Sequence, residues 1–136
     1  MMELNSTELL AIFEHLTNWQ DRYRQIIQLA KMLKDFPEEQ RVVDNQIEGC
    51  ENKVWLTCKK NSEQTLTFSG DSEGRIVKGL LTILIILANN KTVEQIAQTD
   101  FLAILKELYI IDELSQSRQL GLNNIITRIK LLANNN

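Results

Sequence analysis

The chain has 136 residues, of which 43% are hydrophobic and 24% charged, and its formal net charge is -3. This length suits one domain with its own hydrophobic core, so we expect a single domain over residues 1–136. Phosphate backbones are bound by clustered lysine and arginine, so the acidic balance argues against a nucleic-acid partner. The longest apolar run, 80–88, is far shorter than the roughly 20 residues of a membrane helix.

The first residues lack the basic start and apolar middle of a signal peptide, so we expect a cytoplasmic protein whose thiols stay reduced. Its two cysteines, Cys50 and Cys58, are then not a disulfide framework. Their spacing is not that of a C-x-x-C redox motif. Together with the one histidine, His15, they do not supply the ligand spacing of a zinc site. We therefore expect no metal.

The first part of the chain is predicted to form two helices. Asn5 followed by Glu8 resembles a capping box, and apolar residues then recur at helical spacing. A second apolar stripe over 19–33 predicts another helix. This helix should end near Phe36, because Pro37 disfavours a helical backbone in the residue before it.

The spacing of apolar residues changes from a helical to a strand pattern after a polar connection over 38–44. Apolar and polar residues alternate over 54–58, and the alternation returns at 66–68 after a turn-like segment. We therefore expect an antiparallel hairpin, closed by 70–73. A short strand before Gly49 would add a third member to the sheet.

The rest of the chain is predicted to be helical. Residues 76–87 are apolar nearly all round, which indicates a buried central helix, although the isoleucines in this run would also suit a buried strand. Capping residues mark three further helices, which begin at Thr92, at Asp100 and at Ser115 or Ser117.

Cys50 is the residue best suited to covalent chemistry. Gly49 precedes it and a β-prone segment begins at Val54, so we expect the thiol at the lip of a turn beside a rigid strand. The charge of Glu51 would disfavour the thiolate, and Lys53 and nearby backbone amides could compensate. A buried packing cysteine is the alternative, and the spacing alone leaves both interpretations open.

Three further side chains have simpler interpretations. Cys58 lies on the same strand face as Val54 and Leu56, which indicates a core position. His15 indicates a surface or packing position on a helix. Arg118 lies at a helix start, where a cation is mildly unfavourable, so it suggests either a specific partner or a plain surface role.

Four short motifs follow one another along the chain. They are Trp19-x-x-Arg22-Tyr23, the segment 49–56 around Cys50, the segment 70–80, and Ser117-Arg118-x-x-Gly121. In this order they resemble the SufE family, whose members accept sulfur from cysteine desulfurases. The pair Glu51-Asn52 and the triplet Glu73-Gly74-Arg75 resemble the CsdE branch of that family. Leu120 departs from the pattern, in which glutamine is expected.

The resemblance implies an α+β fold like that of IscU-type scaffolds, with a small antiparallel sheet of about three strands flanked by helices. It implies that the protein receives persulfide sulfur from a cysteine desulfurase on Cys50. It also implies that the protein stimulates that enzyme during iron–sulfur cluster assembly. Gly49, Glu51 and Asn52 would form the active-site loop, which would cover the thiol in the free protein and extend it on docking. The resemblance implies no cofactor here, since the pyridoxal phosphate belongs to the partner.

Sulfur transfer makes few demands on this chain. One accessible thiolate suffices to attack a persulfide sulfur, so we do not expect a stand-alone enzyme. Residues beside the thiol must touch the desulfurase, and we expect Glu73, Arg75 and Arg118 among them. A downstream protein would then take the sulfur. The alternatives are an iron–sulfur scaffold of the same fold, disfavoured because Cys50 stands alone, and an interaction module with an inert Cys50.

Overall fold

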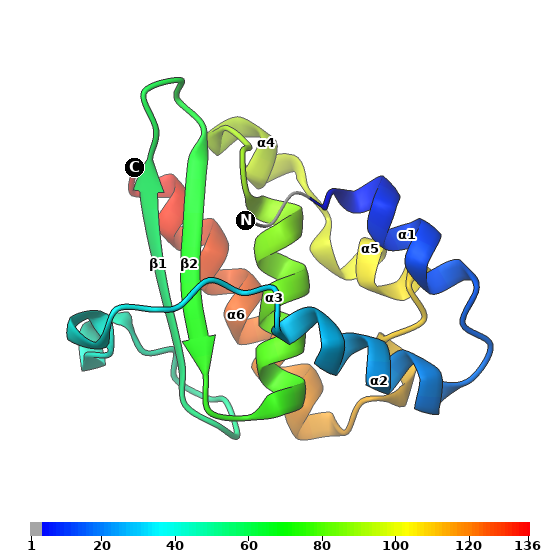
Figure 1. The fold of residues 1–136 in the computed structure, drawn as a ribbon. Helices are drawn as coiled ribbons and strands as arrows, with labels where there is room; N and C mark the ends of the chain where they lie inside the picture. The colour runs from blue at the N-terminus through cyan, green and yellow to red at the C-terminus, as the bar shows by residue number, and fades with distance from the viewer. Residues whose placement is uncertain (1–3) are drawn as a thin grey trace.

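The computed structural model describes residues 4–136 and is drawn in Figure 1. The chain begins with two helices, short 3-10 turns and a hairpin: α1 (Ser6–Glu14), α2 (Trp19–Ala30), η1 (Glu38–Gln40), η2 (Val43–Asn45), β1 (Val54–Lys60) and β2 (Leu66–Ser72). Helices make up the rest: α3 (Arg75–Ala88), α4 (Val93–Gln98), α5 (Phe101–Glu107), η3 (Ile111–Glu113) and α6 (Gln116–Asn134). No helix among residues 4–136 has the length and apolar character needed to cross a membrane.

The sheet is an antiparallel hairpin, and the predicted α+β class is confirmed. Val54 lies opposite Ser72 at one end, and Lys60 lies opposite Leu66 at the other. The third strand expected before Gly49 is reduced to one isolated bridge, between Gln46 and Trp55. The chain leaves the ladder soon after this bridge, because it turns sharply at Gly49.

The predicted closing turn over 70–73 begins too early. Gly70, Asp71 and Ser72 belong to β2, and the turn into α3 follows at Glu73 and Gly74. Gly70 continues the strand at a point of close packing. A Cβ atom there would lie 2.5 Å from the Trp55 carbonyl oxygen, so the absent side chain is what lets the two strands and α3 approach.

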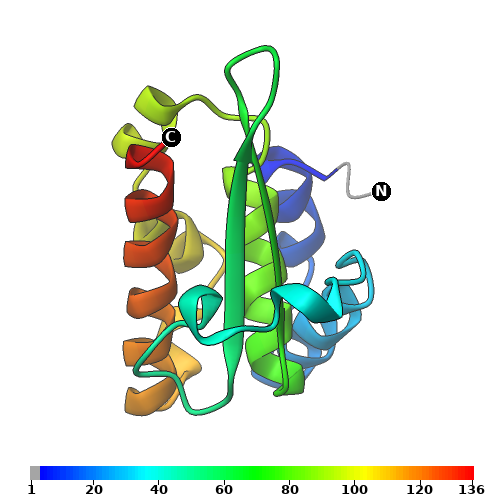
Figure 2. The same ribbon diagram turned by 90° about the vertical axis from the view of Figure 1, so that its left-hand side faces the viewer.

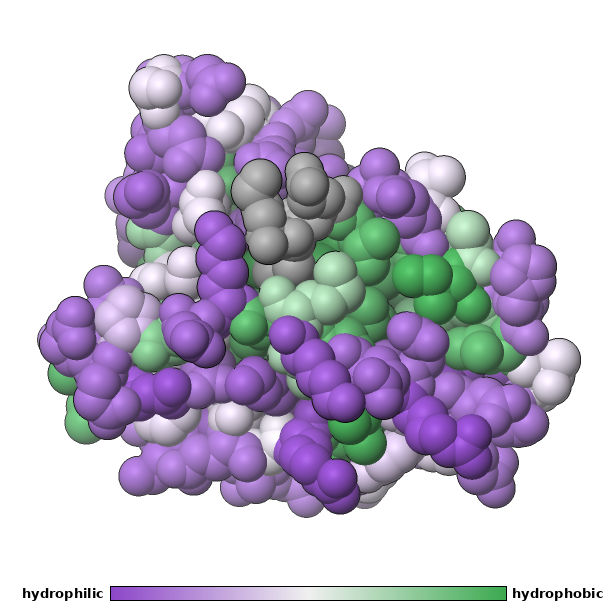
Figure 3. Space-filling model, in the orientation of Figure 1, coloured by the Kyte–Doolittle hydropathy of each residue, from purple (hydrophilic) through white to green (hydrophobic). Residues whose placement is uncertain are grey.

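Helix α3 lies at the centre of the molecule. Every residue from Gly79 to Ala88 is buried, so the run that also suited a strand is a helix packed on all sides. It contacts β2, α2 and α6. Figure 2 shows α6 beside the hairpin on one side, while α1 and α2 lie on the other side beyond α3. The face in Figure 3 is mostly hydrophilic, with an apolar area in its middle, next to α1.

The predicted helix starts are largely confirmed. Side chains cap α1, α4, α5 and α6 at Asn5, Thr92, Asp100 and Ser115, and the first two form full capping boxes. Helix α2, whose start was predicted from its apolar stripe alone, is capped by Asn18, which accepts a hydrogen bond from the Asp21 N–H.

The predicted end of α2 near Phe36 is wrong by six residues, since the helix ends at Ala30. The N–H groups of Met32 and Leu33 bond the carbonyls three residues earlier, so the chain tightens into turns before it reaches Pro37.

The segment between α2 and β1 crosses the outer face of the hairpin, as Figure 2 shows. Arg41 fixes it there, with its guanidinium 5.1 Å from the centre of the Trp55 ring and paired with Asp71. Lys78 of α3 pairs with the same carboxylate at 3.2 Å. Burial alone would raise the pKa of Asp71, but hydrogen bonds from Arg41, the Ser72 backbone and Lys78 hold it below its usual range.

We predict that Asp71→Asn lowers the free energy of unfolding by about 1–3 kcal/mol at neutral pH, because Arg41 and Lys78 lose a charged acceptor. A carboxyl group with a depressed pKa stabilises the fold at pH values above its unfolded pKa of about 3.9. This stabilisation is lost as the pH falls through the pKa of the folded state. Urea unfolding at pH 7 and pH 3 should therefore show the difference between the proteins shrinking in acid. Glu38→Gln, at the exposed ion pair with Arg41, is the matched control and should cost much less. Equal effects of both variants would contradict a stabilising role of the Asp71 carboxylate.

Candidate functional site

Cys50 lies in a short loop between the isolated bridge and β1, which we call the Cys50 loop (residues 48–53). The Ile47 N–H donates to the Val54 carbonyl at 2.8 Å and closes the loop at its base. Gly49 has φ +81°, a left-handed conformation that glycine adopts with little strain. The glycine therefore turns the chain immediately before the cysteine, as the sequence suggested.

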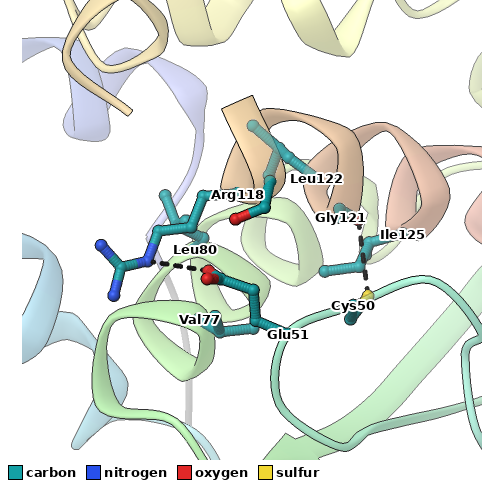
Figure 4. Close-up of a pocket in the computed structure, with 9 residues that line it drawn as sticks. Cys50, Glu51, Val77, Leu80, Arg118, Gly121, Leu122 and Ile125 are labelled. Atoms are coloured by element: carbon teal, nitrogen blue, oxygen red, sulfur yellow. Dashed lines mark hydrogen bonds and ion pairs between the residues drawn. The ribbon is translucent and has the colours of Figure 1, made fainter. Parts of the chain in front are cut away.

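The Cys50 side chain points from this loop to the start of α6, as Figure 4 shows. Its thiol donates a long hydrogen bond of 3.7 Å to the Gly121 carbonyl. Apolar side chains of α3 and α6 line the space beside it: Val77, Leu80, Leu122 and Ile125. The cavity holds about 10 Å³, close to the smallest space that accommodates one water molecule. The thiol is thus half-buried, and nothing as large as an amino acid fits beside it.

Burial governs the acidity of both thiols. It raises the pKa of Cys50 above the ordinary value, and it raises the pKa of Cys58 to about 11. Cys58 is half-buried at the edge of the core, not fully inside it as its strand position suggested. Cys50 in this conformation is therefore mainly a neutral thiol at neutral pH, and a neutral thiol is a poor nucleophile.

Glu51 turns away from the thiol toward α6. Its carboxylate lies 3.5 Å from Nε of Arg118, and the pair is drawn in Figure 4. Both side chains are partly exposed, so the pair contributes little stability, about 0–1 kcal/mol. This contact brings together two predicted site residues that are far apart in sequence.

The other side of the Cys50 loop rests on the turn between β2 and α3. The Glu73 N–H donates to the Lys53 carbonyl at 3.1 Å. The Asn52 side chain packs directly on Gly74, where an added Cβ atom would lie 2.2 Å from its Oδ1 atom. The side chains of Glu73 and Arg75 are exposed. The turn therefore supports the loop through its backbone and leaves these two charges in solvent.

Two polar residues of α6 that the sequence did not single out also hold the loop segment. Asn124 donates from Nδ2 to the Gly49 carbonyl at 3.2 Å, and Arg128 donates to the Gln46 carbonyl at 3.1 Å. Both lie on the helix face that carries Arg118 and Gly121, at steps of three and four residues. This spacing from the Ser-Arg-x-x-Gly motif was the available signal, but it does not reveal which carbonyls the side chains meet.

The remaining singled-out residues lie outside the site. Trp19 and Tyr23 stack edge to face, with ring centres 6.0 Å apart, and Arg22 donates to the Leu16 carbonyl. This motif therefore braces the connection between α1 and α2. His15 is exposed at the end of α1. Within residues 4–136, no three His, Cys, Asp or Glu side chains are grouped to hold a metal ion.

The chain belongs to the SufE family. The family, described as an Fe-S metabolism associated domain, matches residues 7–133. The resemblance inferred from the four sequence motifs, including its leaning toward CsdE, is confirmed.

Individual relatives extend this finding. The chain is 43% identical over 111 residues to the sulfur acceptor protein CsdE of Escherichia coli, which covers 82% of this chain and 76% of that protein. It is 36% identical to an uncharacterized SufE-like protein of Rhizobium meliloti, over 90% of each chain. The solution structure of a hypothetical protein from Thermus thermophilus has the same fold, with a TM-score of 0.77 over 96% of this chain and 93% of that one, at 12% identity.

Proposed function

We propose that this protein is a sulfur acceptor that receives persulfide sulfur from a cysteine desulfurase on Cys50 and stimulates that enzyme. The Cys50 thiolate would attack the terminal sulfur of the partner's persulfide. A new sulfur–sulfur bond forms at Cys50, the partner's own bond breaks, and its cysteine leaves as a thiolate, so no oxidant or reductant is needed. The pyridoxal phosphate that releases sulfur from free cysteine would belong to the partner.

The observation that carries this proposal is a single thiol placed in a small apolar pocket. The pocket has no room for a cysteine substrate, and burial raises the pKa of the Cys50 thiol. A stand-alone enzyme would need the reverse, an open pocket and a base near the sulfur. A carrier needs a thiol that is idle at rest and becomes reactive when a partner draws it out. The relationship to the sulfur acceptor protein CsdE supports the same role.

The loop geometry supports a thiol that moves. The contacts at the loop tip are a long sulfur hydrogen bond and a half-exposed ion pair, both weak. We propose that the thiol leaves its pocket on docking, because the small space beside it does not hold a partner's persulfide. Once sulfur is loaded, return of the loop would shield the persulfide from oxidants and reductants.

An iron–sulfur scaffold is the alternative from another class. Clusters are usually held by several cysteine thiolates. The two cysteines here are Cys50 and Cys58, and the second lies on β1, opposite Phe68. Among residues 4–136 no three His, Cys, Asp or Glu side chains are grouped, and this disfavours the scaffold.

The first test is intact-protein mass spectrometry after incubation with a desulfurase and cysteine. We expect the protein to gain the mass of one sulfur, and peptide mapping to place it on Cys50. Cys50→Ser should abolish the gain and the stimulation of the desulfurase, while Cys58→Ser, the matched control, should retain both. Bound iron would favour the scaffold, and an unchanged mass an interaction module. Stimulation by Cys50→Ser at the normal level would sink the carrier hypothesis.

We further propose that the partner docks on the surface around the Cys50 loop, with Glu73, Arg75 and Arg118 at its rim. The two sulfurs must come within bonding distance, so side chains next to the thiol have to touch the desulfurase. Glu73 and Arg75 are exposed beside the turn that supports the loop. After docking, the sulfur would pass to a downstream acceptor protein.

Charge reversal tests this surface. We expect Glu73→Arg to weaken binding of the desulfurase about two- to tenfold at low salt, with a smaller effect at high salt, because rim charges act through screened electrostatics. Calorimetric titration at two salt concentrations measures it. Glu63→Arg makes the same charge change in the hairpin turn, at the opposite end of the sheet, and should bind like the original protein. Overlapping curves for all three proteins would rule out this face.

A further inference from the structure

The contacts of α6 with residues 46–51, which lead into the Cys50 loop, form an ordered series. Going up the chain from Gln46 to Glu51, the partners on α6 go down the helix from Arg128 to Arg118. The pairs are Gln46 with Arg128, Gly49 with Asn124, Cys50 with Gly121, and Glu51 with Arg118. One face of α6 therefore contacts this segment at four positions, in reverse order along the helix.

These four contacts differ in how firmly they fix the residues they join. Gln46 is also bridged to Trp55, and Ile47 is bonded to Val54, so the base of the loop stays on the sheet even without α6. Nearer the tip, the thiol contact spans 3.7 Å and the ion pair is half-exposed. Among the described contacts of α6 with residues 48–53, the bond from Asn124 to Gly49 is the one of ordinary hydrogen-bond length, at 3.2 Å.

Gly49 is also the residue at which the chain turns immediately before the thiol. Its φ of +81° directs the chain toward α6 just before Cys50, and its bare backbone lets Asn124 approach. A Cβ atom at position 49 would lie 2.4 Å from the Asn124 Nδ2 atom. The same glycine thus provides both the turn and the access that the Asn124 bond requires.

We infer that Asn124 is a positioning residue whose side-chain amide holds the Gly49 carbonyl and thereby sets how often the Cys50 thiol leaves its pocket. The inference deepens the proposed function, because it names the residue that keeps the acceptor thiol idle at rest. Loss of one such hydrogen bond should raise the open population of the loop about two- to tenfold. A partner that binds the open loop should then bind more tightly by the same factor, while that population stays small.

The test measures the alkylation rate of Cys50 in the free protein, so it needs no desulfurase and stands apart from the sulfur-acceptor proposal. We expect Asn124→Ala to raise the rate about two- to tenfold. Asn124→Asp keeps the shape but replaces the donor with a carboxylate that repels the Gly49 carbonyl, so it should raise the rate at least as much. Asn123→Ala, at the exposed neighbouring position on α6, is the matched control and should leave it unchanged.

Alkylation of Cys58 in the same samples reports general loosening of the fold. Faster labelling confined to Cys50 in both Asn124 variants, with an unchanged thermal unfolding temperature of the protein, supports the inference. Unchanged Cys50 labelling overturns it. A rise that also appears at Cys58 or in Asn123→Ala overturns it as well, because it would mark loss of overall stability. Loss of sulfur transfer in the original protein would defeat the proposed function alone.

Discussion

The burial of α3 on all its sides is the constraint on which the rest of the structure depends. A helix that is apolar nearly all round must be covered completely, and here the hairpin, α2 and α6 provide that cover. Near the start of α3, Val77 and Leu80 line a small pocket together with Leu122 and Ile125 of α6. The Cys50 loop lines the same pocket, so the apolar surface that drives folding also shelters the thiol.

This arrangement separates the shelter of the thiol from the attachment of the loop. The pocket supplies an apolar environment that keeps the thiol protonated, because burial raises its pKa. The attachment of the loop relies on polar contacts with half-exposed groups, which contribute little individually. A change of position alone would therefore raise the reactivity of the thiol, once a partner offers better contacts than α6 does.

Much of this follows from the sequence, and the exceptions have physical causes. Caps at Asn5, Thr92 and Asp100 are local signals, so they locate helix starts well. The end of α2 was misjudged because proline limits a helix from one side but does not say how early the chain tightens into turns. The sequence motifs identified the Cys50 thiol and placed Arg118 near the start of α6. The roles of Asn124 and Arg128 depend on which backbone carbonyls the folded loop presents. The spacing of residues along the helix does not predict those carbonyls.

The central claim is that the Cys50 thiol is sheltered on α6 until the loop leaves it. The most direct measurement is the rate at which a small alkylating reagent modifies Cys50 at neutral pH, in the folded protein and in the same protein unfolded in urea, with Cys58→Ser removing the second thiol. The account predicts that folding slows the reaction at least about tenfold, through burial and a raised pKa, and that a desulfurase lacking its own cysteine relieves part of this protection. Equal rates in the folded and unfolded protein would contradict it.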